Sequence, residues 1–374
     1  MDMNVRIKQL IMLQSFLLLA ACSGDDSVVD TFVNDYDRGT YTMENAIFFN
    51  VDGFNRGTTD KVSTRAVGRE DLTRLRQDGF AVFACRTGQH PYVSSTISWN
   101  FMWNQKVTYS TNGWSYAPIK YWPNEAGGEQ RDEYITFFAY APYSKGDESD
   151  KASLCIVDYS NATEIGDPWL VYQLGGSEND WQDHQVDLLY AFAKDQQRPD
   201  KTGAKVKLSF RHALAGAGDQ VKVVCSDMLK SKLSQLAASL SENVTMTLEK
   251  VRLDYTLTRK GRLVLNNASE PNWQAVASED PMVHRILEIN SNHVMARASD
   301  SSCSTYEYSK SDLGVFYIPM NPVGHTQQVE VTLSYSLSNG YSGTVGGVIK
   351  LAANGGYSQN QDFVLTISGA TPLQ

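Results

Sequence analysis

Alternation of apolar and polar side chains with a period of two residues is the feature that most constrains the fold of this chain. It recurs in residues 206–210, 251–257, 329–337 and 363–367. A period of two places every second side chain on the same face of an extended strand, so each segment is expected to be a strand with one buried face. Asn-Gly pairs at Asn112-Gly113 and Asn339-Gly340 predict tight hairpins. The chain is therefore expected to be mostly β, with antiparallel sheets.

Residues 227–242 break this pattern, because leucines recur there every three or four positions. Ser226 or Asp227 precedes them as a helix cap, so one helix is expected, packed on a sheet rather than on a partner. Residues 196–203 combine proline, glycine and charges between two strand patterns, which is typical of a linker. A division there gives an N-terminal β-sandwich at 66–200 and a C-terminal β-sandwich at 201–374.

The first residues carry an export signal. Arg6 and Lys8 precede an apolar run at 10–21 that is too short to span a bilayer permanently. The run ends in Leu-Ala-Ala-Cys, which resembles the bacterial lipoprotein box and predicts cleavage after residue 21 with Cys22 as the lipid-bearing residue. An ordinary secretory signal that ends before a cysteine is the alternative. Acyl chains on Cys22 would anchor the protein without spanning the membrane, and the acidic stretch that follows is expected to be a tether.

Net charge and cysteine spacing bear on the partners of the protein and on the state of its thiols. The formal net charge of −9 argues against nucleic acid as a partner. Beyond Cys22 the cysteines have no C-x-x-C spacing, and they are interpreted as buried free thiols, although three disulfide connectivities stay open. They are Cys85, Cys155, Cys225 and Cys303.

A strand near the front of the chain is a candidate for removal. Ile47, Phe49 and Val51 would share one face of this strand, and a loop rich in glycine, threonine and charges follows, ending at Arg65. An arginine in an exposed loop is a site that a trypsin-like protease can cut. Cleavage there would free residues 22–65 as a propeptide and leave an apolar groove with unpaired backbone groups. The alternative is an ordinary edge strand and an ordinary surface arginine.

The other end of the chain offers a replacement strand. Residues 361–368 form the last strong strand pattern, with Phe363, Leu365 and Ile367 on one face. Insertion of this segment into the groove of another molecule would be a head-to-tail contact that does not close, and hence would give a filament.

Several motifs in order along the chain resemble the fimbrillin family, the subunits of type V pili. Besides the lipoprotein box, these are IFF at 47–49, TRA at 64–66, WSYAP at 114–118, YWP at 121–123, ITFFAYAP at 135–142, QVDLLYA at 185–191, LSFRHAL at 208–214 and VFYIP at 315–319. The resemblance implies two transthyretin-like β-sandwich domains in tandem and delivery to the outer membrane as a surface lipoprotein. It also implies arginine-specific removal of the first strand, with Arg65 at the cleavage position and Arg69 as second choice, and polymerisation by a C-terminal donor strand.

The expected partners follow from that resemblance: other fimbrial subunits, an arginine-specific protease, the outer membrane through the lipid anchor, and a receptor on a host or bacterial surface. No catalytic, phosphate-binding or metal-binding motif occurs, so neither an enzyme nor a cofactor is expected. The alternative function is that of a non-polymerising lipoprotein that binds glycans through an aromatic cluster. We favour core packing for these aromatic side chains. The cluster comprises Trp99, Trp103, Trp114, Tyr116, Tyr121 and Trp122.

Overall fold

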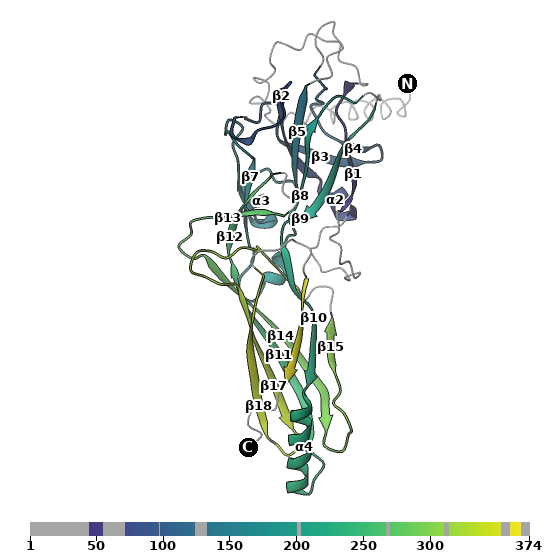
Figure 1. Cartoon of the computed structure of the whole chain (residues 1–374), viewed down its shortest axis with the longest axis vertical. Coiled ribbons are helices and arrows are strands. Elements are labelled where there is room, and N and C mark those ends of the chain that lie inside the picture. Colours follow the sequence, from purple (N-terminus) through teal and green to yellow (C-terminus); the bar gives the residue numbers. More distant parts are fainter. Residues whose placement is uncertain are drawn as a thin grey trace, which may run out of the picture.

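The computed structural model describes residues 45–54, 72–96, 98–123, 133–199, 203–266, 270–309, 314–352 and 360–367. These residues form an elongated molecule with two lobes stacked along its long axis (Figure 1). Strands dominate both lobes, which confirms the expectation of a mostly β protein built from sandwich sheets.

The upper lobe is built on a seven-stranded sheet with the order β1-β9-β8-β5-β2-β3-β4. Its strands are β1 (Phe49–Phe54), β2 (Phe80–Gly88), β3 (Met102–Ser110), β4 (Gly113–Ser115), β5 (Tyr134–Ala141), β8 (Leu189–Gln196) and β9 (Val206–His212). Side chains of β2 alternate between two apolar clusters, with Phe80 and Val82 on one face and Ala81 and Phe83 on the other. Both faces of the sheet are therefore buried.

The second sheet of the upper lobe has the order β13-β12-β7-β6 and covers one face of the first. Its strands are β6 (Ile156–Tyr159), β7 (Trp169–Gln173), β12 (Lys260–Val264) and β13 (Asn272–Ala275). The short helices α2 (Leu72–Asp78) and α3 (Glu148–Leu154) and the 3-10 turns η3 (Ser94–Thr96) and η4 (Trp181–His184) lie in the connections. Leu75 of α2 is buried in the cluster on the other face of the first sheet.

The lower lobe packs two sheets around one core. The first has the order β14-β11-β17-β18, and in the second β10 pairs with β15, β16 and β19. These strands are β10 (Ala215–Cys225), β11 (Thr245–Thr258), β14 (Met282–Arg297), β15 (Tyr306–Ser309), β16 (Val315–Tyr317), β17 (Gln328–Leu337), β18 (Ser342–Lys350) and β19 (Asn360–Ile367). Both Asn-Gly hairpins form as predicted, between β3 and β4 and between β17 and β18.

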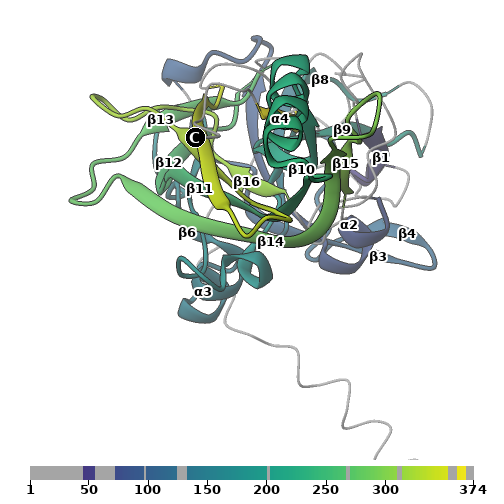
Figure 2. The same cartoon turned by 90° about the horizontal axis from the view of Figure 1, so that it is seen from below.

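The helix predicted at 227–242 is also confirmed, as α4 (Asp227–Leu240). Its N-cap is Ser226, whose hydroxyl accepts a hydrogen bond from the backbone N–H of Leu229. Leu229 and Leu233 are buried in the lower core, so the leucine stripe packs on a sheet. Seen from below, α4 lies beside β10 and β15 (Figure 2).

Strand pairing divides the chain differently from the predicted boundary between residues 200 and 201. β9 pairs with β8 and β1, and β12 pairs with β7, so strands from the second half of the sequence complete the upper lobe. The stretch 196–203 connects β8 and β9, two neighbours in the same sheet. Proline, glycine and charge mark turns as well as linkers, and composition alone does not separate the two. The chain enters the lower lobe at residues 213–214, between β9 and β10.

Two pairings depart from the antiparallel rule. β1 runs parallel to β9, and β19 runs parallel to β10. Both strands come from the ends of the described chain, and both lie along the stretch 206–225 that links the lobes. None of the described residues forms a helix that is long and apolar enough to cross a membrane.

Candidate functional site

The first candidate region is the place occupied by residues 45–51, which we call the β1 slot. Ile47, Phe49 and Val51 are buried there, with 0%, 1% and 9% of their surfaces exposed. The ring of Phe49 lies 5.6 Å from those of Tyr116 and Phe137, between centroids. The three side chains predicted to share one face therefore do so, and they fill the core of the curled sheet.

Backbone partners flank the β1 slot on both sides. On one side β1 follows β9 in register from Phe49↔Val206 to Val51↔Leu208, and the amide of Val206 donates to the carbonyl of Phe48 at 2.8 Å. On the other side, residues 45–47 bridge to 120–122. The amide of Ile47 donates to the Lys120 carbonyl, and the amide of Trp122 donates to the Asn45 carbonyl, each at 2.9 Å. The segment thus has backbone partners both on β9 and on residues 120–122.

One side chain, that of Tyr116, also bonds to the backbone of residues 45–51. The hydroxyl of Tyr116 donates to the carbonyl of Ile47 at 2.9 Å, inside the lobe. Burial raises the pKa of Tyr116 above its ordinary range. The hydroxyl therefore stays protonated and available as a donor to whatever backbone occupies the slot.

The second candidate region is the place occupied by β19, which we call the β19 slot. Phe363, Leu365 and Ile367 are buried in the lower core, whereas Val364 between them is 64% exposed. The register runs from Val221↔Phe363 to Cys225↔Ile367. This alternation agrees with the predicted face of the donor-strand candidate. In this structure the candidate lies in its own lower lobe.

The two slots differ in the backbone partners that they offer. The pairing of β19 is with β10, and the amide of Ser226 donates to the carbonyl of Ile367 at 3.0 Å. Residues 45–51 pair with β9 and also with 120–122. Sequence patterns did not indicate the bridge at 120–122, because residues 120–122 have no strand alternation of their own.

The aromatic cluster considered for glycan binding lies mainly in the core. Trp99, Trp114 and Trp122 expose 3%, 7% and 4% of their surfaces, and the Trp99 ring packs edge-on against Phe138. Trp114 and Trp122 belong to the core on one face of the first sheet and Trp99 to the core on the other. The cluster therefore does not form the exposed platform that the glycan-binding alternative requires, and core packing is confirmed.

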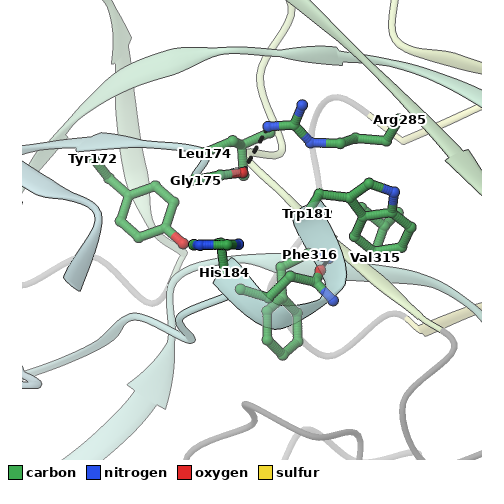
Figure 3. Close-up of a pocket in the computed structure, with 9 residues that line it drawn as sticks. Tyr172, Leu174, Gly175, Trp181, His184, Arg285, Val315 and Phe316 are labelled. Carbon is green, nitrogen blue, oxygen red and sulfur yellow. Dashed lines mark hydrogen bonds between the residues drawn. The ribbon is translucent and has the colours of Figure 1, made fainter. Parts of the chain in front are cut away.

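A small pocket lies where the lobes meet (Figure 3). Arg285 of β14 donates to the carbonyls of Gly175 and Gly176, at 2.7 and 3.0 Å, and burial lowers its pKa. The indole of Trp181 donates to the Ile286 carbonyl at 3.1 Å and its ring joins the lower core. These contacts tie a loop of the upper lobe to the lower sheet. We interpret the pocket as part of that junction, since its lining serves packing.

The described residues offer little support for a metal-binding site. They bring together no group of three histidine, cysteine or carboxylate side chains that would hold a metal ion. His212 pairs with the buried Asp187 at 2.6 Å, at the end of β9. Cys22, Arg65 and Arg69 lie outside the described residues, so lipidation and cleavage stay predictions.

The fold thus defines a two-lobed β-sandwich protein with a buried apolar strand near each end of the described chain. A family model described as fimbrillin-like matches residues 64–336. The chain belongs to this family.

A fimbrium subunit and a fimbrial protein of known structure are among the proteins to which the chain is similar. Fimbrium subunit Fim1C of Phocaeicola vulgatus is 27% identical over 215 residues, which cover 56% of this chain and 50% of that protein. The chain thus matches about half the length of this curated relative. A crystal structure of a fimbrial protein from Bacteroides vulgatus shares the fold, with a TM-score of 0.57 and 19% identity, over 87% of this chain and 95% of that one.

Proposed function

We propose that the protein is a structural and adhesive subunit of a type V fimbria, without catalytic activity. It is exported as an outer-membrane lipoprotein through Cys22, matured by arginine-specific cleavage at Arg65, and assembled by donor-strand exchange. Membership of the fimbrillin-like family and the similarity to a fimbrium subunit support the coarse part of this proposal. The strand pairing near the two ends of the described chain supports the exchange step, whereas lipidation and cleavage rest on the sequence motifs.

The single observation that carries the exchange mechanism is the likeness of the two end strands. Each buries three alternating apolar side chains, and each runs parallel to the stretch 206–225. A strand that fits beside β10 therefore has the direction and the side-chain alternation that a strand beside β9 requires. Loss of β1 would leave a slot that suits the direction and the side-chain alternation of such a strand.

The interactions that hold a strand in the two slots can be compared. Each triad of buried side chains contributes roughly 5 to 9 kcal/mol at about 1.5 to 3 kcal/mol per side chain, so the apolar terms nearly cancel when β19 leaves its own slot for a neighbour's β1 slot. The β1 slot adds two backbone bonds to residues 120–122 and one to the Tyr116 hydroxyl. At about 0.5 to 1.5 kcal/mol each, these bonds contribute roughly 1.5 to 4.5 kcal/mol. In return β19 gives up a longer pairing, with seven register partners on β10 against four for β1 on β9, and the bond from Ser226 to Ile367, so the hydrogen bonds alone do not favour transfer.

Transfer of β19 therefore supplies no surplus against the entropic cost of association. The mechanism therefore requires that subunits are held at high local concentration. A lipid anchor on Cys22 would supply this concentration by confining precursors to a membrane surface until they are cut. In cells that produce Cys22→Ser, we expect the protein to move from the membrane fraction to the soluble fraction.

The test of the proposal is cleavage of the purified full chain by an arginine-specific protease. We expect a new N-terminus at Ala66 and, after it appears, a ladder of multimers that collapses to monomer on heating in detergent. Arg65→Gln should abolish both, whereas Arg69→Gln, the matched control, should leave both unchanged. A chain that keeps residues 45–54 after exhaustive treatment, or a cut chain that stays monomeric at high concentration, would contradict donor-strand exchange.

A further inference from the structure

Two of the free cysteines lie together in the lower lobe. Cys225 is the last residue of β10 and follows Val221 and Val223, which are buried at alternating positions. Cys303 lies in the connection between β14 and β15. Both are partly buried and pack against the same core. An external reagent can therefore reach them more readily than a fully enclosed thiol.

Strand register brings the backbones near Cys225 and Cys303 together. β10 and β15 are antiparallel, with Val223 opposite Tyr306. Continued by two residues, this register brings Cys225 level with Ser304, the chain neighbour of Cys303. Residues opposite each other in antiparallel strands have Cα atoms about 4.5 to 5.5 Å apart, and Cys303 lies one residue from such a position. The thiols of Cys225 and Cys303 also interact as a hydrogen-bonded pair.

The remaining thiols of the described chain have different surroundings. Cys85 and Cys155 are buried in the upper lobe, with 0% and 3% of their surfaces exposed. The thiol of Cys155 donates to the carbonyl of His184 at 3.5 Å. These two residues serve as internal controls for any reaction assigned to the lower pair.

We propose that Cys225 and Cys303 form an intramolecular disulfide once the chain is outside the cytoplasm, with a disulfide-bearing oxidant as the second reactant. A thiolate attacks one sulfur of the oxidant and releases one thiol, and the other cysteine then attacks the mixed disulfide and releases the second thiol. The protein loses two protons and two electrons. The oxidant gains both and ends as two thiols.

The order of attack follows from the surroundings of each sulfur. Burial, followed by the charge of Cys303, raises the pKa of Cys225 to about 12. Cys225 is therefore a poor first nucleophile, since the thiolate is the reactive form. Cys303 lies in a connection, and we assign the first attack to it and the closing attack to Cys225.

The bond would strengthen one wall of the β19 slot. Cys225 is opposite Ile367 in the β10–β19 register, and the disulfide would tie this end of β10 to the connection that leads into β15. β10 pairs with β15 independently of its pairing with β19. The disulfide would therefore keep β10 in place whether or not β19 is present. This inference is independent of strand exchange and stands if exchange fails.

The experiment uses the full chain with Cys22→Ser, which removes one unrelated thiol. The reduced protein is incubated with oxidised glutathione, the remaining thiols are alkylated with iodoacetamide, and a tryptic digest is analysed by mass spectrometry. We expect peptides 223–230 and 298–310 to be linked, with a mass about 2 Da below their sum. We also expect oxidation to raise the melting temperature by about 5 °C or more.

Cys303→Ser should lose both the linked peptide and the rise in melting temperature, whereas Cys155→Ser, the matched control, should keep both. Three results would overturn the inference: alkylation of both peptides after oxidation, stable glutathione adducts on both, or a bond that joins two chains. A non-reducing gel separates the last case from the intramolecular bond.

Discussion

Truncation of Phe49 tests whether β1 is a separable part of the upper core. Phe49 is 1% exposed and its ring contacts those of Phe80, Tyr116 and Phe137. Removal of a buried phenylalanine side chain costs about 3 to 5 kcal/mol, because transfer energy is lost and a cavity remains. At about 2 to 4 °C per kcal/mol, Phe49→Ala should lower the melting temperature of the upper lobe by roughly 6 to 20 °C.

Phe48 provides a matched control, because it is the same residue type, one position earlier and only partly buried. Phe48→Ala should therefore have a much smaller effect. Tryptophan fluorescence is a suitable probe, since Trp114 and Trp122 lie in the same core as β1. The two lobes need not melt together, so a probe of one lobe is preferable to a global signal.

Cleavage at Arg65 sharpens the test. Once residues up to 65 have dissociated, the Phe49→Ala protein and its parent are the same chain, and their stabilities should become equal. The reasoning would be refuted if Phe48→Ala and Phe49→Ala were equally destabilising. It would also be refuted if the difference from the parent persisted in fully cleaved protein freed of its N-terminal fragment.

Three further perturbations probe other parts of the molecule. Phe363→Ala should destabilise the lower lobe by about 3 to 5 kcal/mol in urea unfolding, whereas Val364→Ala on the same strand should change it by less than about 0.5 kcal/mol. Arg285→Met leaves two carbonyls at the lobe junction without their donor, so we expect a loss of about 2 to 4 kcal/mol and faster proteolysis near residues 174–186. A hydrogen bond from Lys250 lowers the pKa of Glu288, so this carboxylate stabilises the fold above its ordinary pKa, and the contribution disappears as pH falls through the lowered value. Because Glu288 is 38% exposed, Glu288→Gln should cost at most about 1 kcal/mol at neutral pH and nothing in strong acid, as read from urea midpoints.

Local patterns were sufficient to predict several single elements of the fold, although the short helices α2 and α3 were not among them. Alternation at 329–337 and 363–367 predicted strands, and the leucine spacing predicted α4, because each pattern reflects which side chains face a core. The capping role of Ser226 was also readable, since a serine before a helical run satisfies a free backbone donor.

Long-range pairing was not readable in the same way. Nothing in residues 260–264 indicates that they complete the upper lobe, because β12 is chosen by its register with β7, a partner about ninety residues earlier in the chain. The parallel direction of β1 and β19 was missed for the same reason. Alternation fixes the buried face of a strand, but it does not fix the neighbour or the direction.

The aromatic residues illustrate a third limit. Trp99 and Trp114 are close in sequence but lie on opposite faces of one sheet, in separate cores. Density of tryptophan along the chain left a glycan-binding surface open as the alternative to the favoured core packing, and could not assign each ring to its core. A sheet that is apolar on both faces explains the enrichment without any ligand.

The common stretch 206–225 has a consequence for the polarity of any assembly. Because β1 and β19 follow it in the same direction, a neighbour's tail would fit beside β9 when both molecules point the same way along the fibre. Every junction would then reproduce the one before it, so growth would have no intrinsic end. Termination would have to come from a molecule whose own β1 is never released.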